Sequence, residues 1–318
     1  MKRASIERGS QAAARKRIAV AICTYKRNEP LAVLLNALMA CADRVSDRAA
    51  VGVAIVDDTA EGQARSVAEE FANKFELGVA YRISGKQNIS IARNLALEAA
   101  LDICDWIAMT DDDCEPPAQW LEALIDLQEN TGADAITGRM VRRAPDSAPR
   151  WIREQPFLDL GVEERPNGSE MSVGATFNTL ISSRWLRAHP EIRFDPNMGV
   201  VGGEDMVFFR AAHAAGLKIR FSELGFVYEN EPTDRATFRY QLYVYFWHGN
   251  SAALACVEDG MKRWRVFVHG SASLIRAGAR PAGRILRGQK PQMRFCLAQI
   301  LHAVGKQLGA VGVRIDHR

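Results

Sequence analysis

The chain of 318 residues is 47% hydrophobic and 25% charged, a composition typical of a globular protein and unlike that of a disordered one. This length allows one large domain with a smaller appendage, built around a sizeable core. The six cysteines are scattered and form no C-x-x-C pair, which argues against a zinc site or a disulfide framework and favours a cytosolic protein.

The formal net charge of +3 is distributed unevenly along the chain. Residues 261–318 contain twelve Lys and Arg side chains against one Asp, about +11, and the remaining residues carry about −8. We therefore expect the terminal segment to contact something anionic. Residues 1–16 are polar and basic, and the most apolar window, residues 240–257, is interrupted by polar side chains. We expect neither a secretory signal nor a membrane-spanning helix.

The first half of the chain alternates short apolar runs with segments of helical periodicity. The predicted strands span residues 17–23, 51–56, 79–83, 106–110 and 133–140. Four helices are predicted between these strands. The first follows a turn at residues 28–30, the second spans residues 61–75, the third spans residues 90–101 with Ser90 as its N-cap, and the fourth begins at Pro116-Pro117. This alternation predicts an α/β fold in which helices flank both faces of a mostly parallel sheet.

The second half begins with a Pro-rich, charged connection over residues 142–170, which we expect to be a loop over the pocket. Beyond it, the sequence predicts strands at residues 172–182, 217–221 and 225–229, a helix from Gly202 to Ala215, and basic helices after Thr233. The expected organisation is a flexible segment (1–16), an α/β domain (17–255, with halves 17–140 and 141–255) and a basic helical extension (256–318).

Clustered carboxylates follow two of the predicted strands. Asp111, Asp112 and Asp113 follow the fourth strand, and adjacent carboxylates that repel one another suggest a hard divalent cation such as Mg²⁺ or Mn²⁺. In an extended segment, Asp111 and Asp113 would share one side while Asp112 faces elsewhere. The alternative is a solvated acidic turn. Strand ends of a parallel sheet meet at one edge, so we expect one shared pocket.

Asp57 and Asp58 close the second strand, where a carboxylate can accept hydrogen bonds from a base or a ribose; the alternative is turn chemistry. A Gly-started loop leads into the helix that carries Arg93, a cation suited to phosphate, although a surface arginine is the alternative. Glu204 and Asp205 begin a helix after two glycines. They are candidates for a general base, or they simply complement the helix dipole.

Taken in order, these motifs resemble those of family 2 glycosyltransferases over residues 18–250. The matching stretches are residues 23–27 in the opening strand, 55–58 in the second strand, 92–94 in the helix, 110–113 as an Asp-x-Asp motif and 203–205 on the acceptor side. Features at residues 116–121, 174–180 and 229–235 are similar to exopolysaccharide-assembly enzymes, in particular succinoglycan-type glucosyltransferases. Thr59-Ala60 departs from the common Gly-Ser, and the absence of Gln-x-x-Arg-Trp favours addition of a single sugar.

The resemblance implies a GT-A fold and assigns roles by position. Asp113 and Asp111 are implied to hold Mg²⁺ or Mn²⁺, and Asp205, with Glu204 in reserve, is implied to be the catalytic base. The residues implied to bind the nucleotide-sugar are Thr24, Tyr25, Arg27, Asp57, Asp58, Arg93, Asp111 and Asp112.

The implied activity is inverting transfer of a hexose, such as glucose, from a UDP-sugar to a hydroxyl of a glycan or lipid-linked glycan. The competing hypotheses are an inactive nucleotide-binding scaffold and a phosphoryl- or nucleotidyl-transfer enzyme. Asp57-Asp58-Thr59 does not supply the Asp-x-Asp-x-Thr arrangement of an aspartyl phosphatase.

The basic extension is interpreted as a contact with an anionic membrane, to which residues 295–304 would add an apolar face. The alternative is a solvated or dimer-forming helical tail, and nucleic acid is not expected because no recognition motif accompanies the charge. The expected location is the cytoplasm, peripheral to the inner face of a bacterial membrane.

Overall fold

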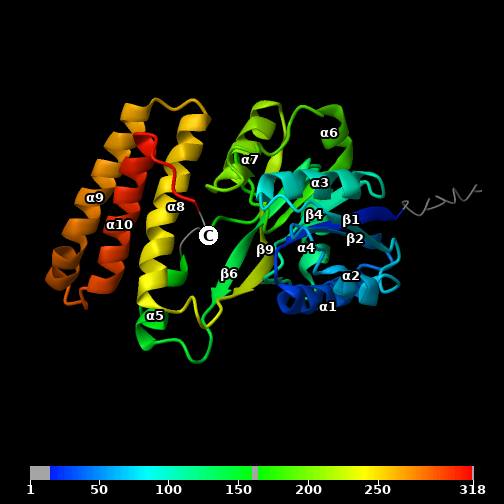
Figure 1. Cartoon of the computed structure of the whole chain (residues 1–318), viewed down its shortest axis with the longest axis horizontal. Coiled ribbons are helices and arrows are strands. Elements are labelled where there is room, and N and C mark those ends of the chain that lie inside the picture. Colours follow the sequence, from blue (N-terminus) through cyan, green and yellow to red (C-terminus); the bar gives the residue numbers. More distant parts are fainter. Residues whose placement is uncertain (1–14, 160–163, 317–318) are drawn as a thin grey trace, which may run out of the picture.

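A mixed sheet with helices on both faces forms most of the chain, and three long helices stand beside it (Figure 1). The structure is a computed structural model that describes residues 15–159 and 164–316. The predicted N-terminal segment therefore lies almost wholly outside the described residues. No helix in the described part of the chain is long and apolar enough to cross a membrane.

The elements follow one another in a βα alternation at first and become helical at the end. The strands are β1 (Lys16–Thr24), β2 (Ala49–Asp57), β3 (Val79–Ile83), β4 (Trp106–Met109), β5 (Cys114–Glu115), β6 (Ala135–Arg143), β7 (Glu170–Met171), β8 (Thr179–Ser182) and β9 (Ile219–Asn230). The helices are α1 (Asn28–Arg44), α2 (Arg65–Phe71), α3 (Ile89–Leu101), α4 (Trp120–Thr131), α5 (Arg150–Glu154), the 3-10 turn η1 (Pro156–Asp159), α6 (Ser183–Ala188), α7 (Glu204–Ala214), α8 (Phe238–Glu258), α9 (Arg263–Leu286) and α10 (Met293–Ala310).

The strand order is β3-β2-β1-β4-β8-β6-β9-β5, with β7 on the side of β9. The four strands from β3 to β4 are parallel, and β6 and β9 are also parallel, whereas the short strands β5, β7 and β8 pair antiparallel. This arrangement confirms the predicted α/β class with flanking helices. The order reverses between β1 and β4, and ligands bind at such a switch point, beyond the carboxyl ends of the strands.

Each face of the sheet has its own hydrophobic core. On one face, Leu31 of α1, Phe71 of α2 and Trp120 of α4 pack against apolar side chains of β1 and β2. On the other face, α3, α6 and α7 contribute a second cluster that includes Phe208. Because both faces are covered, the central strands are apolar except at their ends; all nine residues of β2 are buried, including Asp57 at its carboxyl end.

Strands β6 and β9 bend away from the rest of the sheet at a bulge between Gly138 and Met140. The buried side chain of Asn178 holds the bulge: its Nδ2 donates to the carbonyls of Arg139, at 3.0 Å, and Gly225, at 2.6 Å. Its Oδ1 accepts a hydrogen bond from Trp120 Nε1 at 2.8 Å. The bulge carries the ends of β6 and β9 past the end of β4 and beside the loop that follows it.

The terminal helices α8, α9 and α10 form a separate layer, which we call the helical unit (residues 238–310). Helices α8 and α10 touch at their backbones: a Cβ on Gly249 would lie 2.0 Å from the carbonyl oxygen of His302, and one on Gly305 would lie 2.1 Å from that of Phe246. Phe295 and Ala298 are buried with Tyr245 of α8. Residues 295–304, predicted to add an apolar face, are divided between interior and surface: Phe295, Cys296, Ala298 and Ala303 are buried, whereas Leu297 is exposed.

Several element boundaries differ from those predicted. Helix α3 is capped by Asn88, whose Oδ1 accepts from the Ile91 amide at 3.2 Å, and Ser90 is buried inside the first turn. Helix α4 begins after the two prolines, at Trp120, and α2 is shorter than predicted. Only the last four residues of the strand predicted at 172–182 pair in the sheet.

The two strands predicted at 217–221 and 225–229 are one bent strand, β9, because Gly225 allows the chain to continue through the bulge. The connection predicted at 142–170 as a loop contains α5, η1 and the start of β7.

We predict that Gly138→Ala lowers the free energy of unfolding by about 1–3 kcal/mol, because its Cβ would lie 1.8 Å from the carbonyl oxygen of Gly225. Gly278→Ala in α9 is the control: a Cβ there has no neighbour within 4 Å, and we expect about 0.5–1 kcal/mol of stabilisation. Urea denaturation measures both. Equal effects of the two substitutions would contradict the tight packing inferred at the bulge.

Candidate active site

The carboxyl ends of three neighbouring parallel strands bring the predicted motifs to one edge of the sheet. Thr24 ends β1, Asp57 ends β2, and Asp111 to Asp113 follow β4. The Thr24 hydroxyl donates to Asp112 Oδ2 at 2.8 Å, across the β1–β4 pair. These strand ends therefore lie at one edge of the sheet, and one pocket shared by the two aspartate clusters stays a prediction.

The three aspartates lie in a turn rather than in an extended segment. The Cys114 amide donates to the Asp111 carbonyl at 3.1 Å, which closes the turn. One guanidinium nitrogen, Arg27 Nη1, lies 2.9 Å from Asp112 Oδ1 and 2.7 Å from Asp113 Oδ2. The expectation that Asp112 faces away from its neighbours is wrong for this reason: the turn lets Asp112 and Asp113 share one cation.

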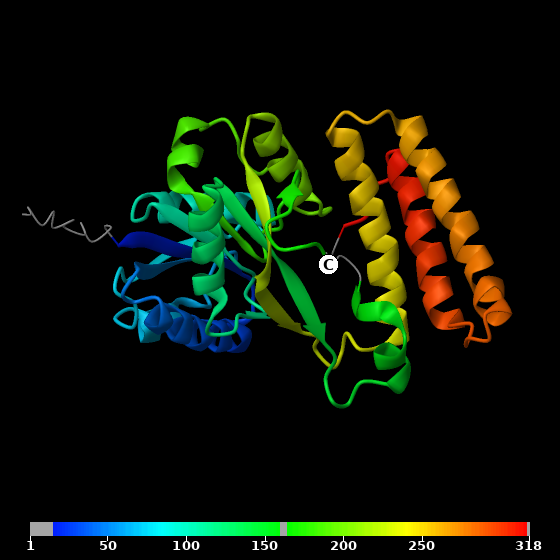
Figure 2. The ribbon, with the colours of Figure 1, turned by 180° about the vertical axis from the view of Figure 1, so that it is seen from behind.

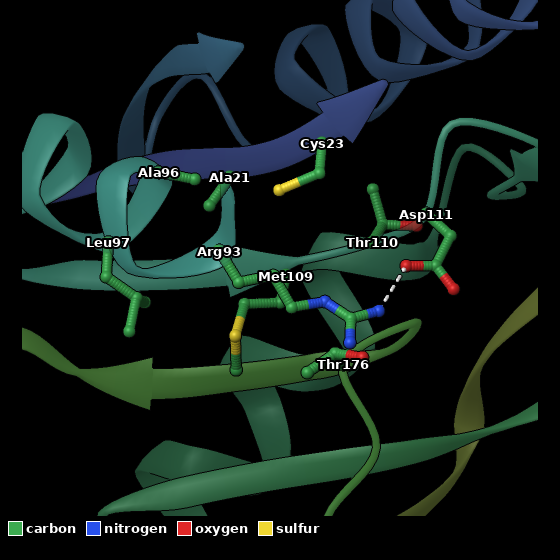
Figure 3. Close-up of a pocket in the computed structure, with 9 residues that line it drawn as sticks. All are labelled: Ala21, Cys23, Arg93, Ala96, Leu97, Met109, Thr110, Asp111 and Thr176. Carbon is green, nitrogen blue, oxygen red and sulfur yellow. Dashed lines mark hydrogen bonds and ion pairs between the residues drawn. The ribbon is translucent and has the colours of Figure 1, made fainter. Parts of the chain in front are cut away.

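Arg93 connects the three aspartates Asp111, Asp112 and Asp113, which we call the aspartate triad, to the start of α7. Its side chain extends from α3 past Cys23 and Met109, and Nη2 lies 3.2 Å from Asp111 Oδ1 (Figure 3). Its Nη1 forms an ion pair with Glu204. The Arg93 side chain is 13% exposed, so its charge is balanced mainly by these two carboxylates. Through Arg93, Asp111 and the Glu204-Asp205 motif are thus joined in one ion-paired network.

Two glycines in left-handed conformation lead into α7 and place its first residues. Gly202 has φ +83, and a Cβ there would lie 2.4 Å from the ring of Trp247 on α8. Asp205 Oδ1 accepts a hydrogen bond from the Met206 amide at 2.7 Å. Among the described residues nothing donates to Asp205 Oδ2, whereas Glu204 is engaged by Arg93. Burial raises the pKa of Asp205, against the opposing charge of Arg93.

Asp57 and Asp58 accept hydrogen bonds from neighbouring amides and hydroxyls of the protein. Both oxygens of Asp57 accept from protein donors: Oδ1 from the amide and hydroxyl of Thr59, and Oδ2 from the Ala64 amide and the Tyr81 hydroxyl. Burial alone would raise the pKa of Asp57, but these hydrogen bonds outweigh it and lower the pKa.

Asp58 accepts from Ser84 and from three successive amides of the loop that enters α3. Among the described residues, only the Asn88 amide donates to Asp58 Oδ2, at 2.8 Å, so this oxygen keeps more acceptor capacity than those of Asp57. Tyr25 is 38% exposed at the rim, and its ring lies under Lys26 Nζ at 5.0 Å. Tyr25 and Asp57 thus stand apart from the ion-paired network of the triad.

A second group of charged residues, absent from the sequence analysis as a site, lies beyond the bulge. Arg142 on β6 pairs in register with Glu229 on β9, with Nε 2.9 Å from Glu229 Oε2 and Nη2 3.0 Å from Glu231 Oε2. Gln241 of α8 donates to Glu231 Oε1 at 3.0 Å. Arg235 Nη1 lies 3.9 Å from Asp113 Oδ2, which joins this group to the triad. The sequence signal was the stretch at residues 229–235, which contains Glu229, Glu231 and Arg235 and was noted only for its resemblance to exopolysaccharide-assembly enzymes.

The network is negative overall. Seven carboxylates (Asp111, Asp112, Asp113, Glu204, Asp205, Glu229 and Glu231) face four guanidinium groups (Arg27, Arg93, Arg142 and Arg235). Burial raises the pKa of Asp112 to about 6 and that of Glu229 to about 7, in each case against a neighbouring arginine. An added diphosphate would increase the repulsion, so an anionic ligand here requires a cation or protonated carboxyls.

The residues present fit a divalent cation that is shared with a ligand. Among residues 15–159 and 164–316, no three His, Cys, Asp or Glu side chains are arranged to hold a metal ion by themselves. However, Asp111 Oδ2 and Asp113 Oδ1 have no hydrogen-bond donor in the described part of the chain. Mg²⁺ is usually bound by one or two carboxylates together with substrate phosphates and water, which matches this donor set.

Comparison with known proteins identifies the class. Residues 19–189 match the family described as Glycosyl transferase family 2, and the chain belongs to this family. It is 32% identical over 301 residues to the succinoglycan biosynthesis protein ExoM of Rhizobium meliloti (strain 1021), covering 93% of this chain and 94% of ExoM. A more distant relative is the glycosyltransferase AglE of Haloferax volcanii, 23% identical over 205 residues that cover 64% of each chain.

Solved structures support the fold. The chain aligns with S. aureus TarS 1–349 in complex with UDP at a TM-score of 0.53 and 14% identity, covering 93% of this chain and 92% of that one. It aligns with GalNAc-T7 with UDP, GalNAc and Mn²⁺ at a TM-score of 0.54 and 13% identity, covering 77% and 50%. The predicted GT-A fold is confirmed.

Glu229 gives a pH-dependent prediction for stability. Its pKa of about 7 in the folded protein exceeds the ordinary value of 4.5, so between these pH values the unfolded chain loses this proton while the folded chain keeps it. The contribution of Glu229 to stability is therefore complete below about pH 4.5 and is lost as the pH rises to about 7. The glutamine side chain of Glu229→Gln does not titrate in this pH range, so the variant lacks this loss of stability.

We expect Glu229→Gln to gain stability relative to the wild type by up to about 3 kcal/mol between pH 5 and pH 8. Urea unfolding of both proteins at the two pH values measures this difference. A difference between variant and wild type that does not change with pH would contradict the raised pKa.

Proposed function

We propose that this protein is an inverting glycosyltransferase that transfers a hexose from a UDP-sugar to a hydroxyl of a glycan or lipid-linked glycan in exopolysaccharide or cell-surface assembly. The observation that carries the proposal is that Arg93 pairs with both Asp111 and Glu204, which brings the aspartate cluster and the Glu204-Asp205 motif together. Support for the substrates comes from relatives: ExoM is a succinoglycan biosynthesis protein, and TarS 1–349 has been crystallised with UDP-GlcNAc.

For the donor, we assign the diphosphate to the Asp111–Asp113 turn. Asp113 and Asp111 would hold Mg²⁺ or Mn²⁺ through the carboxylate oxygens that accept no hydrogen bond from the described residues. The cation would supply Lewis-acid stabilisation of the departing diphosphate. Arg27 holds Asp112 and Asp113 in place. The Mn²⁺ in GalNAc-T7, a protein of the same fold, is consistent with this assignment.

For the nucleoside, we assign the carboxyl ends of β1 and β2. Tyr25 supplies an exposed ring at the rim, and Asp58 Oδ2 retains acceptor capacity for a base N–H or a ribose hydroxyl. The Thr24 hydroxyl orients Asp112 by a hydrogen bond, and Asp57 holds the loop between β2 and α2 by accepting from the Ala64 amide. Both residues therefore support the proposed nucleoside site. Arg93 is assigned to the sugar-diphosphate side.

For the acceptor, we assign Asp205 as the general base. A base must be free to accept a proton and needs a pKa raised toward neutrality; Asp205 Oδ2 has no donor among the described residues and burial raises its pKa. Glu204 is ion-paired with Arg93 and is better suited to orient that arginine. In an inverting displacement the acceptor hydroxyl attacks the anomeric carbon on the side opposite the departing diphosphate, and Asp205 would take the hydroxyl proton on that acceptor side.

The group Arg142, Glu229, Glu231 and Gln241 is assigned to the hydroxyls of the transferred or accepting sugar. It contains both donors and acceptors and borders the triad through Arg235. For location, we propose the cytoplasmic, inner face of a bacterial membrane, where a lipid-linked acceptor is within reach.

We predict that Asp205→Asn keeps donor binding and lowers transfer by ~10²–10⁴-fold, the usual contribution of a general base. The assay incubates pure protein with a panel of UDP-sugars and a glycan acceptor, and follows UDP release. Asp126→Asn, on α4 with 52% of its side chain exposed, is the control and should match the wild type. Near wild-type turnover of Asp205→Asn would remove Asp205 from the mechanism.

A further inference from the structure

Helix α9 carries a stripe of large apolar side chains that face solvent. At 100° per residue these positions fall within an arc of about 100° along the whole length of the helix. Their exposed fractions are 60% for Trp264, 42% for Phe267, 52% for Val268, 72% for Ile275, 61% for Ile285 and 88% for Leu286. Single exposed apolar residues are common, but a continuous helical stripe indicates a partner.

The opposite face of α9 packs on α10 and leaves the stripe uncovered. Val266, Gly270 and Ala277 are buried there, and a Cβ on Gly270 would lie 3.0 Å from the Gln307 side chain. Figure 2 shows α9 as the outermost helix, on the side of the helical unit that is remote from the sheet. The stripe therefore points away from the active site.

The charge on α9 is entirely positive. The helix contains five arginines and no Asp or Glu, and none of these arginines forms an ion pair with a carboxylate in the described part of the chain. Arg265 and Arg276 are exposed on one flank of the apolar stripe, whereas Arg280 turns toward α10, where its Nη1 donates to Gln299 Oε1 at 3.1 Å. A partner for this face must be apolar in the middle and anionic at the side.

A cationic cleft continues this surface beyond the end of α9. It is lined by Arg284, Lys290 and Arg294 from the α9–α10 region and by Glu154 as its one acid. The cleft is also lined by Gln292, whose Oε1 is buried without a hydrogen-bond partner. Exposed Met293 and Leu297 lie beside it in sequence. Positive charge and apolar side chains thus extend from α9 onto the start of α10.

We propose that α9 lies in the surface of an anionic lipid bilayer, with its apolar stripe among the acyl chains and with Arg265 and Arg276 at the lipid phosphates. An interfacial helix of this kind has low net hydrophobicity, a strongly apolar face and basic flanks. Each Lys or Arg near an anionic bilayer contributes about 1 kcal/mol. A second copy of the chain fits this face poorly, because two α9 helices in contact would bring arginine against arginine.

The inference deepens the proposed function, since it names the surface that would present a lipid-linked acceptor, but binding to lipid is measurable without any transfer. The wild-type protein is floated with vesicles of phosphatidylcholine containing phosphatidylglycerol, and with vesicles of phosphatidylcholine alone. We expect flotation with the anionic vesicles that falls as salt is raised. We expect Ile275→Gln/Leu286→Gln to weaken partitioning by about tenfold or more.

The matched control is Val33→Gln, which replaces a 53%-exposed valine on α1 and should float like the wild type. Acyl chains that carry a quencher should quench Trp264 fluorescence, and Trp264→Phe should float but lose that quenching. Equal flotation of the α9 double variant and the Val33 control, or no binding to anionic vesicles, would overturn the proposal. So would loss of a dimer in the double variant without any lipid binding. UDP release in the same samples reports separately on the proposed function.

Discussion

The pairing of one buried guanidinium with two carboxylates from distant segments organises this site. Arg93 projects from α3 between Asp111, after β4, and Glu204, at the start of α7. A charge that is nearly excluded from water must keep its partners, because removing either partner leaves an uncompensated charge, typically at a cost of about 3–5 kcal/mol. Arg93 therefore fixes the positions of Asp111 and Glu204 relative to each other.

The strands of the sheet place the other charged residues of the site around Arg93. Parallel strands place Thr24 and the aspartate triad at one edge, and the bulge held by Asn178 carries Arg142 and Glu229 to the other side of it. The result is an excess of carboxylates that arginines only partly neutralise. Such a site can accept a diphosphate together with a divalent cation, and this requirement links the electrostatics to the proposed chemistry.

Much of this site was accessible from the sequence because its motifs are local. A strand that ends in clustered aspartates, or a helix that starts with Glu204-Asp205, places its side chains through a few neighbouring residues. The second charged group was not accessible, since Arg142 and Glu229 meet only through β6–β9 pairing and a bulge. The alternation expected for Asp111 to Asp113 failed because the segment turns at Cys114.

The same distinction applies to the fold. Buried strands such as β2 were identified from apolar runs, whereas the start of α3 was misplaced: Asn88, not Ser90, accepts the capping hydrogen bond, and its Nδ2 also donates to the Pro196 carbonyl at 2.9 Å. In the helical unit, charge predicted an anionic partner, but periodicity alone did not distinguish the buried face of α10 from the exposed stripe of α9. That distinction depends on the close approach of α8 and α10 at Gly249 and Gly305.

The central claim is that the Asp111–Asp113 turn and a divalent cation together bind the diphosphate of the donor. The most direct measurement is calorimetric titration of UDP into the wild-type protein and into Asp113→Ala, each with Mn²⁺ and with chelator. The account predicts binding by the wild type that depends on Mn²⁺, and loss of that dependence in the variant. Equal affinity of both proteins for UDP in the presence of Mn²⁺ would contradict it.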